Sequence, residues 1–305
     1  MAKEWSGFFY RGCYFPNCVY NIETVKSNPM DQWDIRPDDV VVLTYPKSGT
    51  FWMLNLLSSL YTDLNLLLPA SNKVVRLDQF YEDADDVPGS YGQHAKAMKE
   101  SLHAMPSPRL LFCHLPFQLF PRTWQDGEKK CKIIYLARNP KDVCVSYYHY
   151  MQGILWAGMD LNWDEWVHAF VDGKVWYGSW LDHVLGWRRF GLKENVLHVT
   201  FEDMKKDSKS VLVKVADFLN RPKSDEELDE VVKNCSFTSM SQGVEFYKLI
   251  SSTADQNSFV SSVRHLRKGQ VGDWKNHFLV SQNEFFDREI TVKAENDGQK
   301  FVYHM

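Results

Sequence analysis

The order of apolar and polar positions along the 305-residue chain predicts short buried strands that alternate with helices. Val40 to Leu43 is a continuous β-branched and apolar run, which is typical of a strand buried on both faces of a parallel sheet. Similar runs occupy residues 109–113, 132–137 and 195–201, and Lys73 to Leu77 is expected to form a short edge strand. These runs predict an α/β fold with a central parallel β-sheet that helices cover on both faces.

Stretches with helical periodicity lie between and after these strands. Asn139 fits the N-cap and Pro140 the first turn of a helix that runs through Tyr150. The other helical segments are expected at residues 51–60, 91–105, 162–189, 202–219 and 225–234. The segment 202–219 is expected to be one amphipathic helix.

The length of the chain fits one large α/β domain, which we expect to span residues 1–305. Residues 1–37 are aromatic and irregular, and they are expected to form an arm packed on the domain. Residues 251–269 are expected to form a mobile Ser-rich loop that continues into a basic loop. Residues 296–305 are polar, and we expect them to fray.

Composition and charge restrict the class of partner. The net charge of −4 provides no global basic field for nucleic acid or an anionic membrane, so any anion site must concentrate positive charge locally. The six cysteines form no CxxC pair and no Cys/His metal spacing, so we expect no metal site. The N-terminus lacks an apolar signal segment, and no window of 18 apolar residues occurs. These features favour a reducing, cytoplasmic compartment.

A candidate anion site follows the first buried strand. Lys47, Ser48, Gly49 and Thr50 lie between this strand and the helix that begins near Phe51. A helix N-terminus offers unpaired N–H groups and the positive end of its dipole, and Gly49 allows close approach of a ligand. The nucleotide motif GxxxxGK[ST] is absent, because the lysine here precedes the glycine. The loop alone therefore leaves an incidental strand–turn–helix junction as an alternative.

Two further strands end at residues with suitable chemistry. His114 and Arg138 each follow a predicted strand, as Lys47 does. The carboxyl ends of parallel strands share one edge of a sheet, so the three residues are expected on one rim. A second basic loop contains Arg267 and Lys268; alone, it also fits a solvated basic turn.

Three blocks carry a resemblance to a known family. TYPKSGT (44–50), ARNPKDVCVSYYHY (137–150) and RKGQVGDWKNHF (267–278) resemble the signature blocks of the cytosolic sulfotransferases, in order and across nearly the whole chain. The resemblance implies a fold related to nucleotide kinases. It also implies a sulfonate donor, 3′-phosphoadenosine-5′-phosphosulfate (PAPS), the product 3′-phosphoadenosine-5′-phosphate (PAP), and an acceptor hydroxyl or amine.

The resemblance also implies roles for single residues. His114 would act as general base and Lys47 would neutralise charge on the leaving phosphate oxygen, with Ser146 as a third catalytic residue. Trp52 would stack on the adenine. The donor site as a whole would comprise Lys47, Ser48, Gly49, Thr50, Phe51, Trp52, Arg138, Ser146, Phe201, Cys235, Ser236, Phe237, Met240, Arg267, Lys268 and Gly269.

The sequence departs from the family pattern at several positions. The family usually has a lysine two residues before the histidine, where this chain has Phe112. Phe51, Phe201 and Cys235 replace two threonines and a tyrosine of the pattern. The family's dimer motif appears at residues 275–284 with Leu279 in place of threonine. The resemblance therefore implies a homodimer through this segment, and the substitution at Leu279 weakens that expectation.

Several alternatives follow from these departures. A catalytically weak relative that binds nucleotide or an apolar ligand remains open because of Phe112. A P-loop kinase is disfavoured by the absent GxxxxGK motif, and a membrane-bound carbohydrate sulfotransferase by the missing N-terminal anchor. A small, largely apolar acceptor such as a phenol, sterol or alcohol is expected. The candidate walls of its pocket, each of which fits the hydrophobic core equally well, are Phe15, Phe80, Phe117, Tyr148 and Tyr150.

Overall fold

The computed structural model describes residues 6–17, 20–61, 75–81, 100, 102–153, 160–190, 194–242 and 266–305. A five-stranded parallel sheet lies at its centre, with the strand order β4-β5-β3-β6-β7. This confirms the predicted sheet. Its strands are β3 (Val40–Thr44), β4 (Val75–Arg76), β5 (Leu110–Cys113), β6 (Lys132–Ala137) and β7 (Val196–Thr200).

The apolar run of β3 is buried at every position because the strand is central and both faces of the sheet are covered. Val41 and Leu43 point into one hydrophobic cluster, and Val40 and Val42 point into the other. Two clusters on opposite faces explain why the run lacks the apolar–polar alternation of a half-buried strand.

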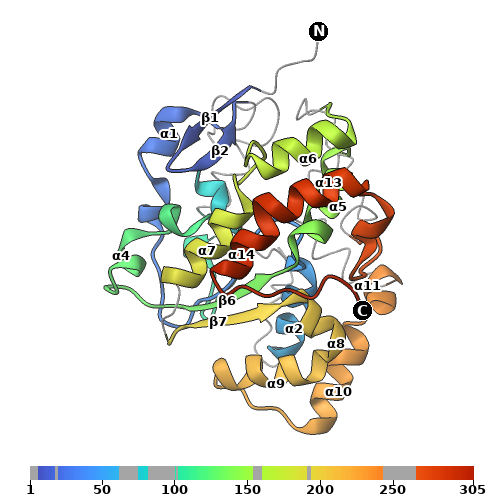
Figure 1. The fold of residues 1–305 in the computed structure, drawn as a ribbon. Helices are drawn as coiled ribbons and strands as arrows, with labels where there is room; N and C mark the ends of the chain where they lie inside the picture. The colour runs from blue at the N-terminus through green and yellow to red at the C-terminus, as the bar shows by residue number, and fades with distance from the viewer. Residues whose placement is uncertain are drawn as a thin grey trace.

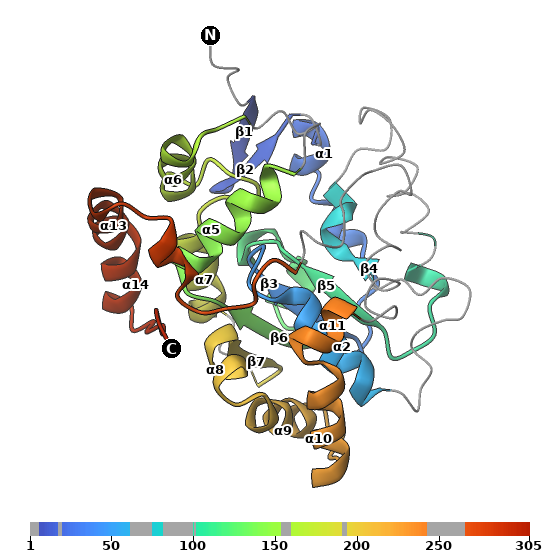
Figure 2. The same ribbon diagram turned by 90° about the vertical axis from the view of Figure 1, so that its right-hand side faces the viewer.

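Helices form the layers on the two faces (Figures 1 and 2). One cluster contains side chains of α2 (Thr50–Leu60), α8 (Phe201–Lys206), α9 (Ser208–Phe218) and α10 (Asp225–Asn234). The other contains side chains of α5 (Pro140–Met151), α6 (Trp163–Val171), α7 (Trp180–Phe190), α13 (Val280–Phe286) and α14 (Val292–Asn296). The antiparallel hairpin of β1 (Gly7–Tyr10) and β2 (Cys13–Pro16) packs into this second cluster. Short helices complete the fold: α1 (Ile22–Lys26), α4 (Arg122–Gln125) and α11 (Phe237–Gln242).

The single helix expected over 202–219 is wrong, because the chain breaks at Asp207 into α8 and α9. Asp207 has φ −153° and ψ 84°, and its carboxylate accepts a hydrogen bond from the Ser210 N–H at 3.0 Å. An aspartate that caps a new helix favours the extended backbone that ends the preceding one. Residues 251–265 of the loop expected at 251–269, and most of the helix expected over 91–105, lie outside the described residues.

The chain after α14 is irregular but makes defined contacts. The carbonyl of Tyr303 accepts a hydrogen bond from Trp274 Nε1 at 2.8 Å, and that of Val302 accepts one from Asn139 Nδ2 at 3.3 Å. The segment expected to fray therefore lies against the start of α5. Among the described residues, no helix is both long and apolar enough to cross a bilayer.

Candidate active site

The carboxyl ends of three neighbouring strands meet at one edge of the sheet, and a pocket opens there. Lys47 lies in the loop after β3, while His114 directly follows β5 and Arg138 directly follows β6. All three line this pocket, whose empty volume including its open mouth is about 1180 Å³. The parallel strand order thus brings together three residues that are far apart in the sequence.

The loop between β3 and α2 follows a path that needs glycine. Lys47 has φ 69° and Gly49 has φ 111°, so both lie in the left-handed region. A Cβ on Gly49 would lie 2.8 Å from Cδ2 of Phe201, which is too close for any real side chain. α2 begins at the next residue, so the positive end of its dipole faces the loop; the N–H groups of Trp52 and Met53 donate to the Gly49 carbonyl at 3.0 and 3.2 Å. The loop and the helix start therefore form a concave donor surface suited to an anion.

Lys47 places a cation close to other cations. Its Nζ lies 4.2 Å from the centroid of the Tyr150 ring, and its carbonyl accepts a hydrogen bond from Arg138 Nη1 at 3.3 Å. Burial, reinforced by the charges of Arg138 and Arg267, lowers the pKa of Lys47 to about 7. A bound anion would offset this repulsion and favour the charged ammonium.

Arg138 is fixed by two loops that also line the pocket. Besides its bond to the Lys47 carbonyl, it donates from Nη2 to the carbonyl of Gln270 at 2.9 Å. Its guanidinium carbon lies 4.2 Å from the centroid of the Phe201 ring. Burial lowers the pKa of Arg138 from its ordinary value, but a guanidinium stays charged in proteins. The planar donor fork is therefore held ready for a phosphate.

Asn139 caps α5 and connects it to α8. Its Oδ1 accepts a hydrogen bond from the Asp142 N–H at 2.9 Å, and its Nδ2 donates to Glu202 Oε1 at 3.0 Å. Glu202 is only 1% exposed, and burial raises the pKa of this carboxyl to about 7. The first turn of the helix that carries Ser146 is thereby held by side chains from two elements.

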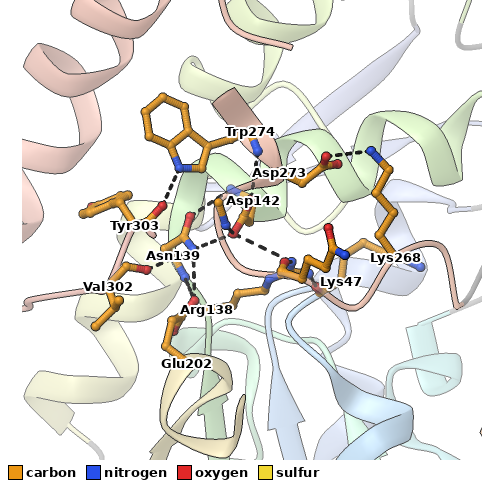
Figure 3. Close-up of polar contacts among 12 residues, drawn as sticks. Lys47, Arg138, Asn139, Asp142, Glu202, Lys268, Asp273, Trp274, Val302 and Tyr303 are labelled. Carbon is orange, nitrogen blue, oxygen red and sulfur yellow. Dashed lines mark hydrogen bonds and ion pairs between the residues drawn. The ribbon is translucent and has the colours of Figure 1, made fainter. Parts of the chain in front are cut away.

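Asp142 joins the start of α5 to the basic loop (Figure 3). One carboxylate oxygen accepts hydrogen bonds from the Gly272 N–H and from Asn139 Nδ2, both at 2.8 Å. The other accepts one from the Trp274 N–H at 3.0 Å. This fully buried carboxylate therefore fixes a loop that lies 130 residues away in the sequence. The sequence analysis did not find this contact, and its only signal was an aspartate at the third position of the helix.

The basic loop holds its two cations against an internal carboxylate. Arg267 Nη2 lies 2.5 Å from one oxygen of Asp273, and Lys268 Nζ lies 2.7 Å from the other. Although burial opposes it, hydrogen bonds led by that from Lys268 lower the pKa of Asp273 far below its ordinary value. Both cations, with Gly269, line the pocket. A phosphate that binds them must share them with Asp273.

His114 is held in one tautomer by the backbone of β3. Its Nδ1 lies 2.9 Å from the carbonyl oxygen of Thr44, and because a carbonyl only accepts, Nδ1 carries the proton. Nε2 then has the lone pair. Burial lowers the pKa of His114 below its ordinary value, so the ring is neutral near pH 7. The rings of Phe112 and Tyr177 contact it edge to face, with centroids 5.6 and 5.3 Å away. A neutral imidazole with a fixed tautomer can act as a general base.

The residues expected around the donor divide into two groups. Those that line the pocket, besides the ones described above, are Thr50, Phe51, Trp52, Ser146, Phe201, Phe237 and Met240. Ser48, Cys235 and Ser236 are not among its lining residues. Ser48 is fully buried, Cys235 Sγ lies 3.4 Å from Ser59 Oγ, and Ser236 Oγ lies 2.7 Å from Ser239 Oγ.

The acceptor wall was predicted less well. Tyr150 lines the pocket, but Phe15 and Phe80 are buried in the hydrophobic core, and Phe117 packs on Trp187. The expectation that these three phenylalanines form the wall is therefore wrong for this pocket. An aromatic side chain carries no sequence signal that separates core from pocket. Lining residues that the sequence analysis missed are Pro46, Arg76, Tyr147, Trp176, Tyr177, Lys205, Leu266 and Gln270.

Comparisons with known proteins agree with this geometry. The profile of the family described as "Sulfotransferase domain" matches residues 37–298. The chain is 34% identical to the amine sulfotransferase of Oryctolagus cuniculus, over 97% of this chain and 93% of that protein. It is 36% identical to sulfotransferase 2A1 of Homo sapiens, over 93% of this chain and 94% of that protein.

A solved structure shares both fold and sequence. The crystal structure of mouse sulfotransferase SULT7A1 complexed with PAP superposes with a TM-score of 0.73. The match covers 95% of each chain at 31% sequence identity.

Proposed function

This chain belongs to the sulfotransferase family and is a sulfotransferase, and from this premise we propose how its pocket binds the donor and transfers the sulfonate. The donor is PAPS and the product is PAP, the ligand named for the mouse relative. The observation that carries the proposal is the single pocket that joins the Lys47 loop, Arg138, the basic loop and His114.

The donor would lie across the cations of the pocket. The loop of Lys47, Ser48, Gly49 and Thr50 would hold the 5′-phosphosulfate at the N-terminus of α2. Arg138 and Ser146 would hold the 3′-phosphate, and the loop of residues 267–269 would close over it. The adenine would stack on Trp52, whose ring centroid lies 5.4 Å from that of Phe201. Phe237 and Met240 line the same pocket.

Transfer would proceed by in-line displacement. The acceptor oxygen or nitrogen attacks sulfur while His114 Nε2 takes its proton. The bond from sulfur to the bridging oxygen breaks, and its electron pair goes to the 5′-phosphate of PAP. Lys47 neutralises the charge that develops there, and Ser146 steadies the nucleotide by its 3′-phosphate. The neutral His114 ring and its fixed Nδ1–H support this role.

The acceptor would be a small, largely apolar hydroxyl or amine compound. Aromatic rings line the pocket beside His114, among them Tyr150, Trp176 and Tyr177. A phenol, a sterol or an alcohol would pack against these rings. One relative is named an amine sulfotransferase, so amines belong in the same test.

The test combines nucleotide binding with turnover. PAP should bind with a Kd in the low micromolar range or tighter, which corresponds to a binding free energy of ~8 kcal/mol. Binding should quench the tryptophan fluorescence through Trp52. Labelled PAPS is then incubated with a panel of phenols, sterols, alcohols and amines. Transfer that His114→Ala abolishes supports the mechanism. PAP binding without transfer to any acceptor would favour a nucleotide-binding relative, and absence of PAP binding at millimolar concentration would refute the donor assignment.

We also propose a cytoplasmic protein that forms a homodimer through residues 275–284. In that segment the neighbouring apolar side chains of Leu279 and Val280 are 65% and 76% exposed, so they are available to a second copy of the chain. Val280→Asp should shift the mass measured by sedimentation from dimer to monomer. A wild-type protein that sediments as a monomer at all concentrations would refute the dimer.

A further inference from the structure

Arg76 lies at the edge of the sheet beside the transfer site. β4 pairs with β5 in parallel, and the register sets Arg76 opposite Phe112. The neighbouring Val75 points into the core cluster of the hairpin, so Arg76 points to the other face of the sheet, as Phe112 does. Phe112 contacts the His114 ring, and both His114 and Arg76 line the pocket. The strand register therefore places the guanidinium on the same side of the sheet as the proposed base, in the same pocket.

One buried carboxylate holds Arg76 and a wall of the His114 ring together. Asp78 Oδ2 lies 3.4 Å from Arg76 Nε and accepts a hydrogen bond from the Tyr177 hydroxyl at 2.5 Å. Tyr177 in turn contacts the His114 ring. The Asp78 side chain is only 1% exposed, whereas that of Arg76 is 24% exposed. Asp78 therefore fixes Arg76 at a defined place at the pocket surface.

The charges around His114 point to the same arrangement. Burial is the largest cause that lowers the pKa of His114, and the positive charges of Arg76 and Lys47 act in the same direction against that of Asp78. Two cations from separate strands thus act on one imidazole. Both cations line the pocket that also contains His114, where an acceptor proton would leave and a sulfonate would move.

We propose that Arg76 is a catalytic residue that contacts the sulfonate oxygens during transfer, opposite the cation that Lys47 presents to the leaving group. This rests on the proposed function. The bond from the acceptor to sulfur forms and the bond from sulfur to the bridging oxygen breaks, while the acceptor proton goes to His114 Nε2. The sulfonate keeps its negative charge throughout, and the planar guanidinium fork matches its oxygens. Phe112 leaves the neighbouring position on β5 without charge, so Arg76 supplies it from β4.

A purely structural role for Arg76 gives a different result. In that case its removal would only leave Asp78 buried without its cation, and lower stability would account for any loss of activity. PAP lacks the sulfonate, so a residue that contacts the sulfonate should not affect PAP affinity. Stability, PAP affinity and kcat therefore separate the two roles.

The test compares Arg76→Met, Arg76→Lys and the double variant Arg76→Met with Asp78→Asn, which removes both charges. Removing a group that stabilises transition-state charge typically lowers kcat by about 10²-fold. We expect a loss of this size for Arg76→Met and the double variant, unchanged PAP affinity, and partial recovery in Arg76→Lys. Arg288→Met is the control, because Arg288 is 67% exposed and its Nε pairs with Glu289 outside the pocket.

A further variant tests the position directly. Phe112→Lys in the Arg76→Met background should restore part of kcat, because it returns a cation to the register partner of residue 76. If the folded variant with Arg76→Met and Asp78→Asn keeps wild-type kcat, or if the loss appears in the acceptor KM or in PAP affinity instead of kcat, the role of Arg76 is wrong. A wild-type protein that binds PAP but transfers to no acceptor would overturn the proposed function and this role together.

Discussion

The two ends of the pocket are built by different kinds of contact. At the nucleotide end the cations rest on fixed oxygen atoms: Arg138 on the carbonyls of Lys47 and Gln270, and Arg267 on Asp273. At the acceptor end, the rings of Phe112 and Tyr177 enclose His114. The first end is held by cations on oxygen acceptors. The second combines aromatic packing with hydrogen bonds from His114 to the Thr44 carbonyl and from Tyr177 to Asp78.

This difference indicates which end of the pocket sets the specificity for the donor and which end can vary its acceptor. Hydrogen bonds need defined donors at defined places, so the nucleotide end tolerates few changes and favours one charged ligand. Aromatic packing depends on volume and is tolerant of changes in side-chain identity, so the acceptor end can change its ligand while the chemistry stays. Each of the following predictions tests one side of this comparison.

The largest effect is expected for Asp142→Ala. The change leaves the N–H groups of Gly272 and Trp274 without their acceptor and removes one of the acceptors of the Asn139 amide. Loss of a buried carboxylate with such partners typically costs about 3–5 kcal/mol of unfolding free energy, which urea unfolding would measure. PAP affinity should fall as well, because the basic loop is no longer fixed to α5. The control is Asp126→Ala at an exposed position, and equal stability of the two variants would contradict the proposed clamp.

Gly49→Ala should have a smaller effect, and the chain offers a matched control. Gly49 and Gly127 both have positive φ, of 111° and 82°, but a Cβ on Gly127 would meet nothing within 4 Å. The backbone penalty of about 1–2 kcal/mol is common to both alanine variants. Only Gly49→Ala adds the clash with Phe201, which typically costs about 1–3 kcal/mol more. Urea unfolding gives both values, and PAP binding should weaken only in Gly49→Ala.

The nucleotide end was the more predictable of the two from sequence. Lys47, His114 and Arg138 each follow a buried strand, and the rule that parallel strands end at one edge is enough to bring them together. The loop–helix junction at Gly49 is likewise a local feature. Local features of this kind can be predicted from the sequence because neighbouring residues determine them.

The remaining features depend on contacts that no local pattern encodes. The two bonds from Asp142 join residues about 130 positions apart, and the place of Arg76 depends on the pairing of a two-residue strand. Phe15 and Phe80 show the same limit. Both lie in the hydrophobic core, and the sequence alone does not distinguish a phenylalanine of the core from one that lines a pocket. The break at Asp207 was missed because two amphipathic helices in succession keep one continuous periodicity.

The smallest effect concerns the pH dependence of PAP binding. The pKa of Lys47 is lowered to about 7, so the free protein loses this charge as the pH rises above 7. A bound phosphate favours the ammonium, so binding at pH 8 takes up a proton and affinity falls with rising pH. The uptake of one proton changes the PAP affinity by at most ~10-fold per pH unit. Glu202, whose pKa burial raises to about 7, gains negative charge over the same range and acts in the same direction.

Variants separate the two groups in that pH dependence. Calorimetric titration of PAP at pH 7, 8 and 8.5, in two buffers of different ionisation enthalpy, counts the protons taken up. These values stay above the phosphate pKa of about 6, so the ligand keeps its charge. Lys47→Met should flatten the slope more than Glu202→Gln, because Lys47 lines the pocket and Glu202 acts through Arg138. Lys174→Met, at an exposed site, should leave the slope unchanged. A wild-type affinity that does not change from pH 7 to 8.5 would show that Lys47 keeps its proton in the empty pocket, and the two ends would then differ in packing but not in their response to charge.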